Sequence, residues 1–555
     1  MRIKWKILAF ESLFIICIVL IHAITWRSYL GPLFVDEIGY LTNAATIKGY
    51  DWSGVAKYIP YYGYGVALFI EPLMIIFKDP KVLYTSIRIA FLLLAVVIYF
   101  LSLRLINEID GKHKIIHNFV AVSVACSPIL ITYKNFVLSE VLIVFVYFLL
   151  LIIFAQYEKT DNWIYLLALL FLSFYLVMIH LRCIAVLIAL IIVLLLKEIK
   201  QKNIYKILFI LMYVCIGIII LIWLKGYFQD KTLLGTVSLG NSISDQKDKI
   251  RYLLSAMGDL ILSSMVKLWT ILVAYVGLPL LGAVFLLSKI RNKQFRYIYV
   301  LLLLTFVLSF AINCAYITFG NRLDSFFYIR YSEYTIVPLY AIGVIGICDS
   351  NFKEKWWILV IVIILQIAMY IVALEEKNGM EMTRCLSICM PEVYVWKTQK
   401  YINYILATKV VTLLLLICNV IGNKKKEIYI CALIILIQGM WCYSAKLALI
   451  DNENENTLPE VLGGYSDEVS IIRNCNAEKI VIITDDSWNH NYSGAYIQFQ
   501  LPKQKIETWN EEEFFEMSDD KIEDIIYVVP NSLCNDISIE NWQMVEKTKN
   551  YIFIK

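Results

Sequence analysis

The chain has 555 residues, of which 60% are hydrophobic and only 17% charged, and its mean hydropathy is +0.69. A water-soluble chain of this length would have to expose very large apolar patches, so the composition predicts a polytopic membrane protein. The formal net charge of +4 is small and spread over many loops, which gives nucleic-acid binding no support. The thirteen cysteines show no CxxC pair and no Cys/His spacing typical of a metal site.

The first predicted element is a span from Ile7 to Trp26, a mostly apolar run of 20 residues without a small-residue cleavage site. It is long enough to cross a bilayer and predicts no cleavable signal peptide. Further apolar runs follow along the chain and bring the number of predicted spans to about thirteen. They lie near residues 7–26, 82–103, 115–131, 139–157, 162–179, 183–196, 206–224, 267–288, 297–316, 334–348, 356–373, 404–421 and 428–446.

Short basic clusters fall on alternate turns between these spans, for example Lys112 with Lys114, and Lys424 to Lys426. The positive-inside rule places such turns in the cytoplasm. The protein is therefore expected in the plasma (inner) membrane with its N-terminus on the cytoplasmic side. The run from Trp163 to Leu196 is 34 residues long, too long for one span, and we divide it at His180 and Arg182.

Two domains are expected. Residues 1–447 form the transmembrane domain, with external loops 27–81, 225–266, 318–333 and 374–403, and residues 448–555 form a small α/β domain outside the cell. The strings KIVIIT, IETW, DIIYVV and YIFIK, with a helix near Tyr492 to Gln500, have the length and composition of strands and a helix in such a domain. Asp485 and Asp486 follow a strand, where turn formation is the favoured role.

Two adjacent carboxylates, Asp36 and Glu37, lie a few residues past the outer end of the first span, in the stretch FVDEIGYLTNAATIKGYDW. Ionised carboxylates this close to a bilayer are costly unless they face water, a cation or a partner, so the pair is a candidate functional site. The alternative is that Asp36 only caps a helix beginning at Glu37.

The first external loop is expected to hold a helix from Asp36 to about Lys48, a Gly/Tyr-rich turn and an apolar segment at 61–77. Glu71 and Pro72 interrupt this segment, and a carboxylate at the centre of a span costs about 2.5–3.5 kcal/mol, so an interfacial helix is expected there. The amphipathic run IRYLLSAMGDLILSSM (250–265) is expected to be another surface helix, and 375–400 a third external segment.

Three further polar features are predicted on the same external face: Ser139-Glu140 at the start of a span, the turn with His180 and Arg182, and the loop from Thr318 to Glu333. Arg182 departs from the positive-inside tendency in a very short loop, as a residue in a substrate site does. The chain has no GxGxxG after a strand and no GxxxxGK[ST]. An external enzyme without a nucleotide supply would receive its activated substrate through the membrane, which favours a sugar on a polyprenyl phosphate.

The ordered set of these features resembles the GT-C class of polyprenyl-phosphate-sugar-dependent glycosyltransferases, which includes the protein O-mannosyltransferases and the lipid A aminoarabinose transferase. The resemblance covers roughly residues 30 to 350. It is carried by VDEIGYLTNAATIKG after the first span, YYGYGVALFIEPL leading to Arg88, SE at Ser139-Glu140, HLR at His180 to Arg182, and FYIRYSEYTIVPLYAIG with Arg330, Tyr331 and Glu333. The first-loop segment lacks the Pro-Pro pair of the protein O-mannosyltransferases.

The resemblance implies a GT-C-like fold and transfer of a sugar from a polyprenyl-phosphate donor to an external acceptor, a cell-envelope glycan, lipid or protein. Asp36 would be the base that deprotonates the acceptor hydroxyl, and Glu37 would orient it, share the acceptor or help to hold a cation. A divalent cation held by Asp36 and Glu140 is one option; the sequence leaves the cofactor open.

Basic residues would stabilise the phosphate of the leaving polyprenyl group. Arg330 and Arg182 are the candidates, with Arg88 and His180 behind them; Glu140 and Tyr331 complete the substrate-binding set. For Arg182 and Arg330, snorkelling to the interface is an equally weighted alternative. Tyr61, Tyr62 and Tyr64 could stack on sugars, but aromatic enrichment at the membrane interface is the favoured explanation.

Two other classes of protein fit parts of the pattern. A lipid-linked glycan transporter or flippase would show internal repeats and polar residues near midplane, whereas this chain shows no repeat and its polar features lie at the outer end. A non-catalytic membrane scaffold would present the C-terminal domain to an envelope partner. A scaffold has no reason to bring Asp36, Glu140, Arg182 and Arg330 together.

Overall fold

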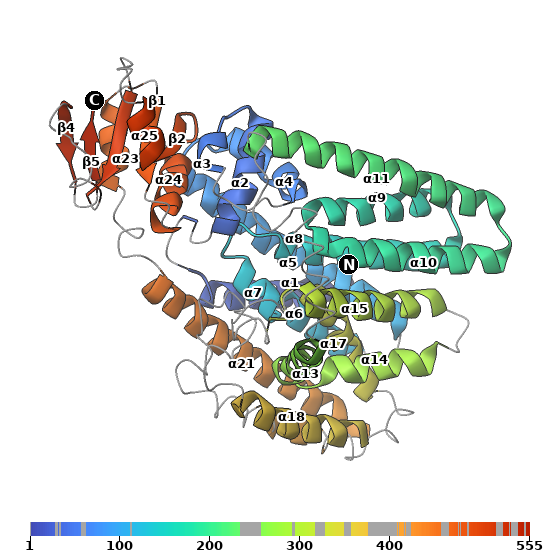
Figure 1. Ribbon diagram of the computed structural model, residues 1–555. Helices are drawn as coiled ribbons and strands as arrows, with labels where there is room; N and C mark the ends of the chain where they lie inside the picture. The colour runs from blue at the N-terminus through green and yellow to red at the C-terminus, as the bar shows by residue number, and fades with distance from the viewer. Residues whose placement is uncertain are drawn as a thin grey trace.

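The computed structural model describes most of the helical domain and the strands of the C-terminal domain (Figure 1). The described residues are 2–27, 31–32, 35–56, 63–110, 114–233, 257–290, 295–316, 328–348, 357–375, 408, 410–415, 417, 423–456, 466–475, 477, 479–484, 488–517, 525–531, 533, 542–548 and 551–555.

The first loop contributes four short helices between the first and second long helices. The helices up to residue 233 are α1 (Arg2–Ile24), α2 (Val35–Lys48), α3 (Ser53–Ala56), η1 (Tyr64–Val66), α4 (Ala67–Ile76), α5 (Pro80–Ile109), α6 (Lys114–Ala125), α7 (Pro128–Tyr133), α8 (Glu140–Thr160), α9 (Trp163–Ile179), η2 (Leu181–Cys183), α10 (Ile184–Gln201) and α11 (Ile204–Leu233). The later helices of this domain are α13 (Met257–Ala274), α14 (Leu278–Lys289), α15 (Arg296–Tyr316), α17 (Glu333–Cys348), α18 (Trp357–Glu375) and α21 (Asn423–Asn456).

Local sequence signals set several helix ends. Asp79 caps α5 by accepting a hydrogen bond from the Val82 backbone N–H at 2.9 Å, and Pro80 occupies the first turn, where its missing N–H costs nothing. Asn162 caps α9 in the same way through the Ile164 N–H. Asp161 ends α8 and Lys202 ends α10 in the left-handed conformation typical of helix C-termini.

Within the described residues, six helices are long and apolar enough to cross a membrane, and six apolar helices of 10–17 residues accompany them. The chain is therefore a multi-pass membrane protein, and the expected count of about thirteen spans stays a prediction. The segment expected at 61–77 contains η1 and α4, with Pro72 inside α4.

Three predicted elements have other limits in the structure. The expected span 267–288 is two helices, α13 and α14, because Gly277 turns with φ of +71° and α14 begins at Leu278 with Pro279 in its first turn. The described part of the expected surface helix, from Met257 onward, is the beginning of α13. Helix α11 also continues nine residues past the predicted end at 224, through the polar residues up to Leu233.

Glycines allow α14 and α17 to pack backbone against backbone. A Cβ on Gly282 would lie 2.0 Å from the Leu339 carbonyl oxygen, and a Cβ on Gly343 would lie 2.0 Å from that of Leu278. Neither position can hold a side chain without separating the helices. This contact fixes α17 and the loop before it, which carries Arg330.

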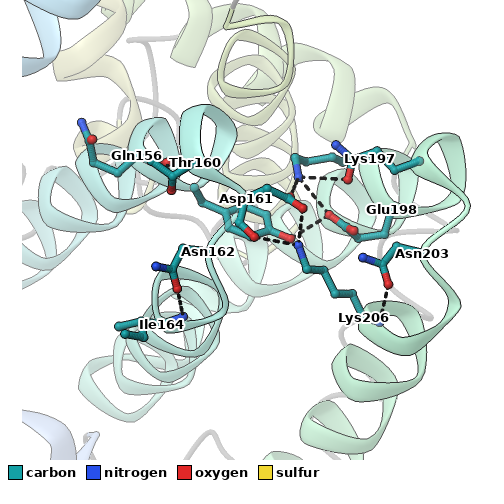
Figure 2. A network of polar contacts seen from close by, with 11 residues as sticks. Gln156, Thr160, Asp161, Asn162, Ile164, Lys197, Glu198, Asn203 and Lys206 are labelled. Carbon is teal, nitrogen blue, oxygen red and sulfur yellow. Dashed lines mark hydrogen bonds and ion pairs between the residues drawn. The ribbon is translucent and has the colours of Figure 1, made fainter.

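The ends of α8, α9, α10 and α11 are joined by a network of charged side chains, shown in Figure 2. Lys197 and Lys206 both pair with Asp161, the latter at 2.5 Å, and Lys197 also contacts Glu198 at 3.0 Å. The Tyr157 hydroxyl donates a hydrogen bond to Glu198 Oε1 at 2.7 Å. We call these five residues the helix-end network.

The C-terminal domain is a five-stranded sheet with strand order β2-β1-β3-β5-β4; α24 and α25 pack on β1 and β2, and α23 packs on α24. Its elements are α23 (Ser466–Asn474), β1 (Lys479–Thr484), α24 (Trp488–Gln500), β2 (Lys505–Asn510), α25 (Glu511–Met517), β3 (Ile525–Pro530), β4 (Met544–Lys547) and β5 (Tyr551–Ile554). Strand β1 pairs in parallel with β2 and β3, whereas β5 runs antiparallel to β3 and β4.

The four predicted strand strings and the predicted helix are confirmed; β4 was not predicted. The predicted boundary at residue 448 falls inside α21, and the domain limits stay a prediction. Figure 1 shows the sheet at one end of the molecule, beside α2 and α3 of the first loop.

Candidate functional site

Four charged residues from four separate segments meet at one end of α8. Arg182 Nη2 lies 2.8 Å from Glu140 Oε1, and Arg330 Nε lies 2.5 Å from the same oxygen. Arg330 Nη1 lies 3.6 Å from Asp36 Oδ2. We call Asp36, Glu140, Arg182 and Arg330 the acid–arginine cluster. The structure thus brings together the residues that the sequence placed on one external face.

Helix ends and short loops position these side chains. Glu140 is the first residue of α8, where the partial positive charge of a helix N-terminus favours a carboxylate. Asp36 lies in the first turn of α2, and Arg182 in the single turn of η2 between α9 and α10. Arg330 precedes α17 in a loop tied to α15, because the Asn313 side-chain amide donates to the Tyr328 carbonyl oxygen at 2.9 Å.

The two carboxylates of the cluster differ in access to water. The Glu140 side chain is 0% exposed and Asp36 is 26% exposed. Glu140 is enclosed by two guanidinium groups and holds them in place. Asp36 is the carboxylate that a molecule entering from water can reach.

Both arginines stay charged in this setting. Burial alone would lower the pKa of Arg182 and of Arg330, but the Glu140 carboxylate outweighs this effect and raises both above the usual range. Each guanidinium also faces a ring, Arg182 that of Tyr331 at 4.8 Å and Arg330 that of Tyr133 at 5.0 Å.

Two nitrogen atoms of the Arg182 guanidinium could donate hydrogen bonds to a further group. Its Nε and Nη1 atoms are buried and find no oxygen acceptor among the described residues. Unsatisfied buried donors are costly, and those of a guanidinium match the oxygens of phosphate or carboxylate groups. The arrangement is suited to an anion that reaches the cluster from the side of Arg182.

His180 and Tyr331 line the cluster on the Arg182 side, with their rings 5.5 Å apart in an edge-to-face contact. Loss of water around His180, together with the neighbouring Arg182, holds the pKa of the imidazole well below its usual value. The ring is therefore neutral at neutral pH. His180 Nδ1 accepts the Arg182 backbone N–H at 3.3 Å, which leaves the ring proton on Nε2.

Glu37 does not face the cluster with Asp36. Its side chain is fully buried, and Glu37 Oε2 accepts hydrogen bonds from the Tyr84 hydroxyl at 2.6 Å and the Val137 backbone N–H at 2.8 Å. These contacts join the first turn of α2 to α5 and to the turn before α8. They suit a residue that orients the helix carrying Asp36.

Arg88 belongs to this neighbouring buried network and does not join the acid–arginine cluster. Arg88 Nη2 donates to the Arg27 carbonyl oxygen at 2.6 Å and to Asn135 Oδ1 at 3.2 Å, and its guanidinium lies 4.2 Å from the Trp26 ring. Lys134 is buried in the same network and donates to the Thr25 carbonyl oxygen at 2.9 Å. The sequence alone did not single out Arg27, Tyr84, Lys134 and Asn135 as residues of this network.

Of the three tyrosines considered for stacking on sugars, Tyr64 alone lies among the described residues. Tyr64 stacks on Phe228 of α11, with ring centroids 5.0 Å apart and planes at 8°, so it packs two elements together. Tyr61 and Tyr62, like Asp485 and Asp486, lie outside the described residues. Gly63 and Gly65 let the turn at η1 lie on the end of α9, since a Cβ on either would be 2.3–2.5 Å from backbone atoms of Met178 or Ile179.

The donor set does not favour a divalent cation between Asp36 and Glu140. Glu140 Oε1 already accepts from two guanidinium groups, whose positive charges would repel a cation at this point. Within the described residues, no group of three His, Cys, Asp or Glu side chains could hold a metal ion.

Comparison with solved structures gives matches over nearly the whole chain. A crystal structure of ArnT from Cupriavidus metallidurans in the apo state aligns over 99% of this chain and 98% of that chain, with a TM-score of 0.53 and 12% identity. A second, of the same protein bound to undecaprenyl phosphate, aligns over 98% of each chain, with a TM-score of 0.55 and 12% identity. The chain has the ArnT fold. The expected GT-C-like fold is confirmed, since ArnT is a GT-C glycosyltransferase.

No family model matches the sequence, and no curated protein matches it. The likeness to ArnT is therefore one of fold.

Proposed function

We propose that this protein is an integral membrane glycosyltransferase that moves a sugar from a polyprenyl-phosphate donor to an acceptor outside the cell. The observation that carries the proposal is the acid–arginine cluster: one partly exposed carboxylate beside two arginines that a buried glutamate holds in place. The fold supports it, because a protein of the same fold has been crystallised with undecaprenyl phosphate.

In this proposal Asp36 is the base. The acceptor hydroxyl oxygen attacks the anomeric carbon, its proton moves to Asp36, and the bond from the anomeric carbon to the phosphate oxygen breaks. The electron pair of that bond leaves with the polyprenyl phosphate. Arg182 and Arg330 stabilise the charge on this phosphate, and the unsatisfied donors of Arg182 give it hydrogen bonds.

The remaining residues of the site have supporting roles. Glu140 keeps both guanidinium groups fixed, so that little reorganisation is needed during the reaction. Neutral His180, with its proton on Nε2, can donate to a sugar hydroxyl or phosphate oxygen, and the Tyr331 ring supports Arg182. Glu37 and Arg88 hold the first loop in place. Arg88 is thus assigned to the scaffold around the site.

We assign the acid–arginine cluster to the outer face of the plasma membrane, with the N-terminus in the cytoplasm and the C-terminal domain outside. Reporter fusions after Lys114 and Lys426 should then be cytoplasmic, and fusions near Asp51 and at Lys555 external. A cytoplasmic C-terminus would contradict this orientation.

The experiment that tests the function compares a strain lacking this protein with strains that carry the wild type or Arg330→Ala. Loss of transfer should cause a lipid-linked sugar to accumulate, detectable by mass spectrometry of membrane lipids, and the wild type should remove it. Lys206→Ala, in the helix-end network, serves as the matched control and should also remove it. An unchanged lipid-linked sugar pool in all four strains would contradict the proposed function.

A further inference from the structure

The C-terminal domain meets the first loop at a seam where, at Gly54, two backbones lie in direct contact. Strand β2, at one edge of the sheet, packs on α3. A Cβ on Gly54 of α3 would lie 2.4 Å from the Ile506 carbonyl oxygen and 2.9 Å from the Glu507 Cα. The α3 backbone therefore lies directly on the β2 backbone, an approach that glycine alone permits.

Side chains fasten this seam on both sides of Gly54. The Trp52 indole N–H donates to the Pro502 carbonyl oxygen at 2.9 Å, and the Trp52 side chain is 1% exposed. Lys505 Nζ lies 3.3 Å from Asp51 Oδ2 at the half-exposed rim. Val55 of α3 belongs to the same apolar core as Ile482 of β1, so one core runs from the membrane domain into the sheet.

One residue of the C-terminal domain reaches the network behind Asp36. The Phe499 ring, at the end of α24, meets the Tyr84 ring edge to face, with centroids 6.2 Å apart. The Tyr84 hydroxyl donates to Glu37 at 2.6 Å, and Glu37 follows Asp36 in the first turn of α2. Phe499, Tyr84 and Glu37 are all buried. A chain of direct contacts thus links α24 to the helix that carries Asp36.

We propose that the C-terminal domain positions the carboxylate of Asp36, with Phe499 as the positioning residue that holds Tyr84 against Glu37. In this role Phe499 acts through Tyr84, whose ring it contacts and whose hydroxyl donates to Glu37. The domain is then a working part of the transferase site. The catalytic consequence rests on the proposed function, whereas the positioning of α2 does not.

The test uses the full-length protein in detergent or nanodiscs and two readouts. Backbone hydrogen exchange of α2 and of residues 135–138 reports positioning, and steady-state transfer reports its consequence. Phe499→Ala removes the ring contact, and Gly54→Ala forces the seam apart from the opposite side. Lys505→Ala removes only the half-exposed ion pair and is the matched control. If Phe499→Ala does not fold, Phe499→Leu keeps most of the apolar volume without the ring edge.

Phe499→Ala and Gly54→Ala should each speed exchange in α2 by about 10-fold, while α14 and α17 exchange as in the wild type. In transfer, kcat should fall by about 10-fold to 100-fold with little change in KM, because a misplaced base impairs the chemical step. Lys505→Ala should match the wild type in both readouts.

Tyr84→Phe removes only the hydroxyl. In the double variant Tyr84→Phe/Phe499→Ala, kcat should fall by much less than the product of the two single-variant factors, because both substitutions act through one contact. Unchanged α2 exchange in a folded Phe499→Ala protein would overturn the positioning role, whatever its transfer rate. If the variants show faster α2 exchange but the wild-type protein transfers no sugar, the positioning role stands and only the proposed function is contradicted.

Discussion

A fully buried glutamate lies at each end of α8, Glu140 of α8 itself and Glu198 of α10, but Glu140 pairs with two arginines whereas Glu198 pairs with one lysine. At the N-terminal end, Glu140 Oε1 binds two arginines, and Glu140 Oε2 has no partner among the described residues. At the C-terminal end, Glu198 Oε1 binds Lys197 and the Tyr157 hydroxyl, and Glu198 Oε2 is likewise unpartnered there.

The cations distinguish the two clusters. In the helix-end network both lysines converge on Asp161, which ends α8, so each ammonium group holds helix ends together (Figure 2). In the acid–arginine cluster Arg182 keeps two buried donors without an oxygen acceptor in the described part of the chain, and a partly exposed Asp36 lies beside Arg330. A network in which each cation is paired with a carboxylate stabilises a fold. Guanidinium donors without an oxygen acceptor among the described residues, beside an accessible carboxylate, are suited to binding and chemistry.

The largest expected effect comes from deleting one cation in each cluster. Arg330→Ala should lower kcat/KM for transfer by about 100-fold to 1,000-fold, because an electrostatic contact to the leaving phosphate is lost. Arg330→Lys should recover only part of this, since a point charge replaces a planar fork that also contacts Glu140. Lys206→Ala should transfer near the wild-type rate. Equal rates for the two alanine variants would remove the distinction between the clusters.

A smaller effect is expected from neutralising the two glutamates. Glu140→Gln should lower transfer by about 10-fold to 100-fold, because the two guanidinium groups lose the charge that orients them. Glu198→Gln should leave transfer unchanged and lower the free energy of unfolding by about 1–3 kcal/mol. Transfer assays with thermal unfolding of both purified variants check this pair. A Glu198→Gln protein that is folded but inactive would contradict the structural role of the helix-end network.

The smallest expected effect is on thermal stability at acid pH, through the carboxyl group of Asp161. Partial burial opposes the charge of Asp161, but hydrogen bonds from Lys197 and Lys206 outweigh it and hold the pKa of this carboxyl below its usual value of 3.8. An aspartate with a lowered folded pKa stabilises the fold above its unfolded value, and this stabilisation is lost as pH falls through the folded value. Because the side chain is 43% exposed, the effect should be small: we expect the wild-type Tm to drop between pH 5 and pH 3 by about 2 °C more than the Tm of Asp161→Asn. An equal drop in both proteins would show that the pair does not stabilise the fold.

Much of the helical domain could be predicted because lipid imposes its pattern on the sequence: apolar runs of sufficient length end at polar turns. The break between α13 and α14 was missed because the run around Gly277 is apolar on both sides, and the Gly-Leu-Pro signal was outweighed by length. Strands in the C-terminal domain were predictable from short β-branched strings. β4, whose four residues are exposed, carries no such signal.

The acid–arginine cluster could be predicted because the parity of spans places helix ends on one face, and four polar features shared that face. The partners of Glu37 could not, since Tyr84 and Val137 are 47 and 100 residues away in sequence. Lys134 did carry a signal: it is a basic residue in a short turn predicted to be external, the same departure that singled out Arg182. The seam at Gly54 depends on backbone proximity between segments about 450 residues apart, which no local pattern reveals.

If Asp36 is the base of a sugar transfer, the transfer rate of Asp36→Asn must show it. Asn keeps the size of the side chain and caps helices about as well as Asp, so α2 should survive while the base is lost. We expect a folded protein whose kcat falls by on the order of 100-fold or more, the scale typical of losing a general base. A folded Asp36→Asn protein that transfers sugar at a near-normal rate would contradict it and leave Asp36 as a helix cap.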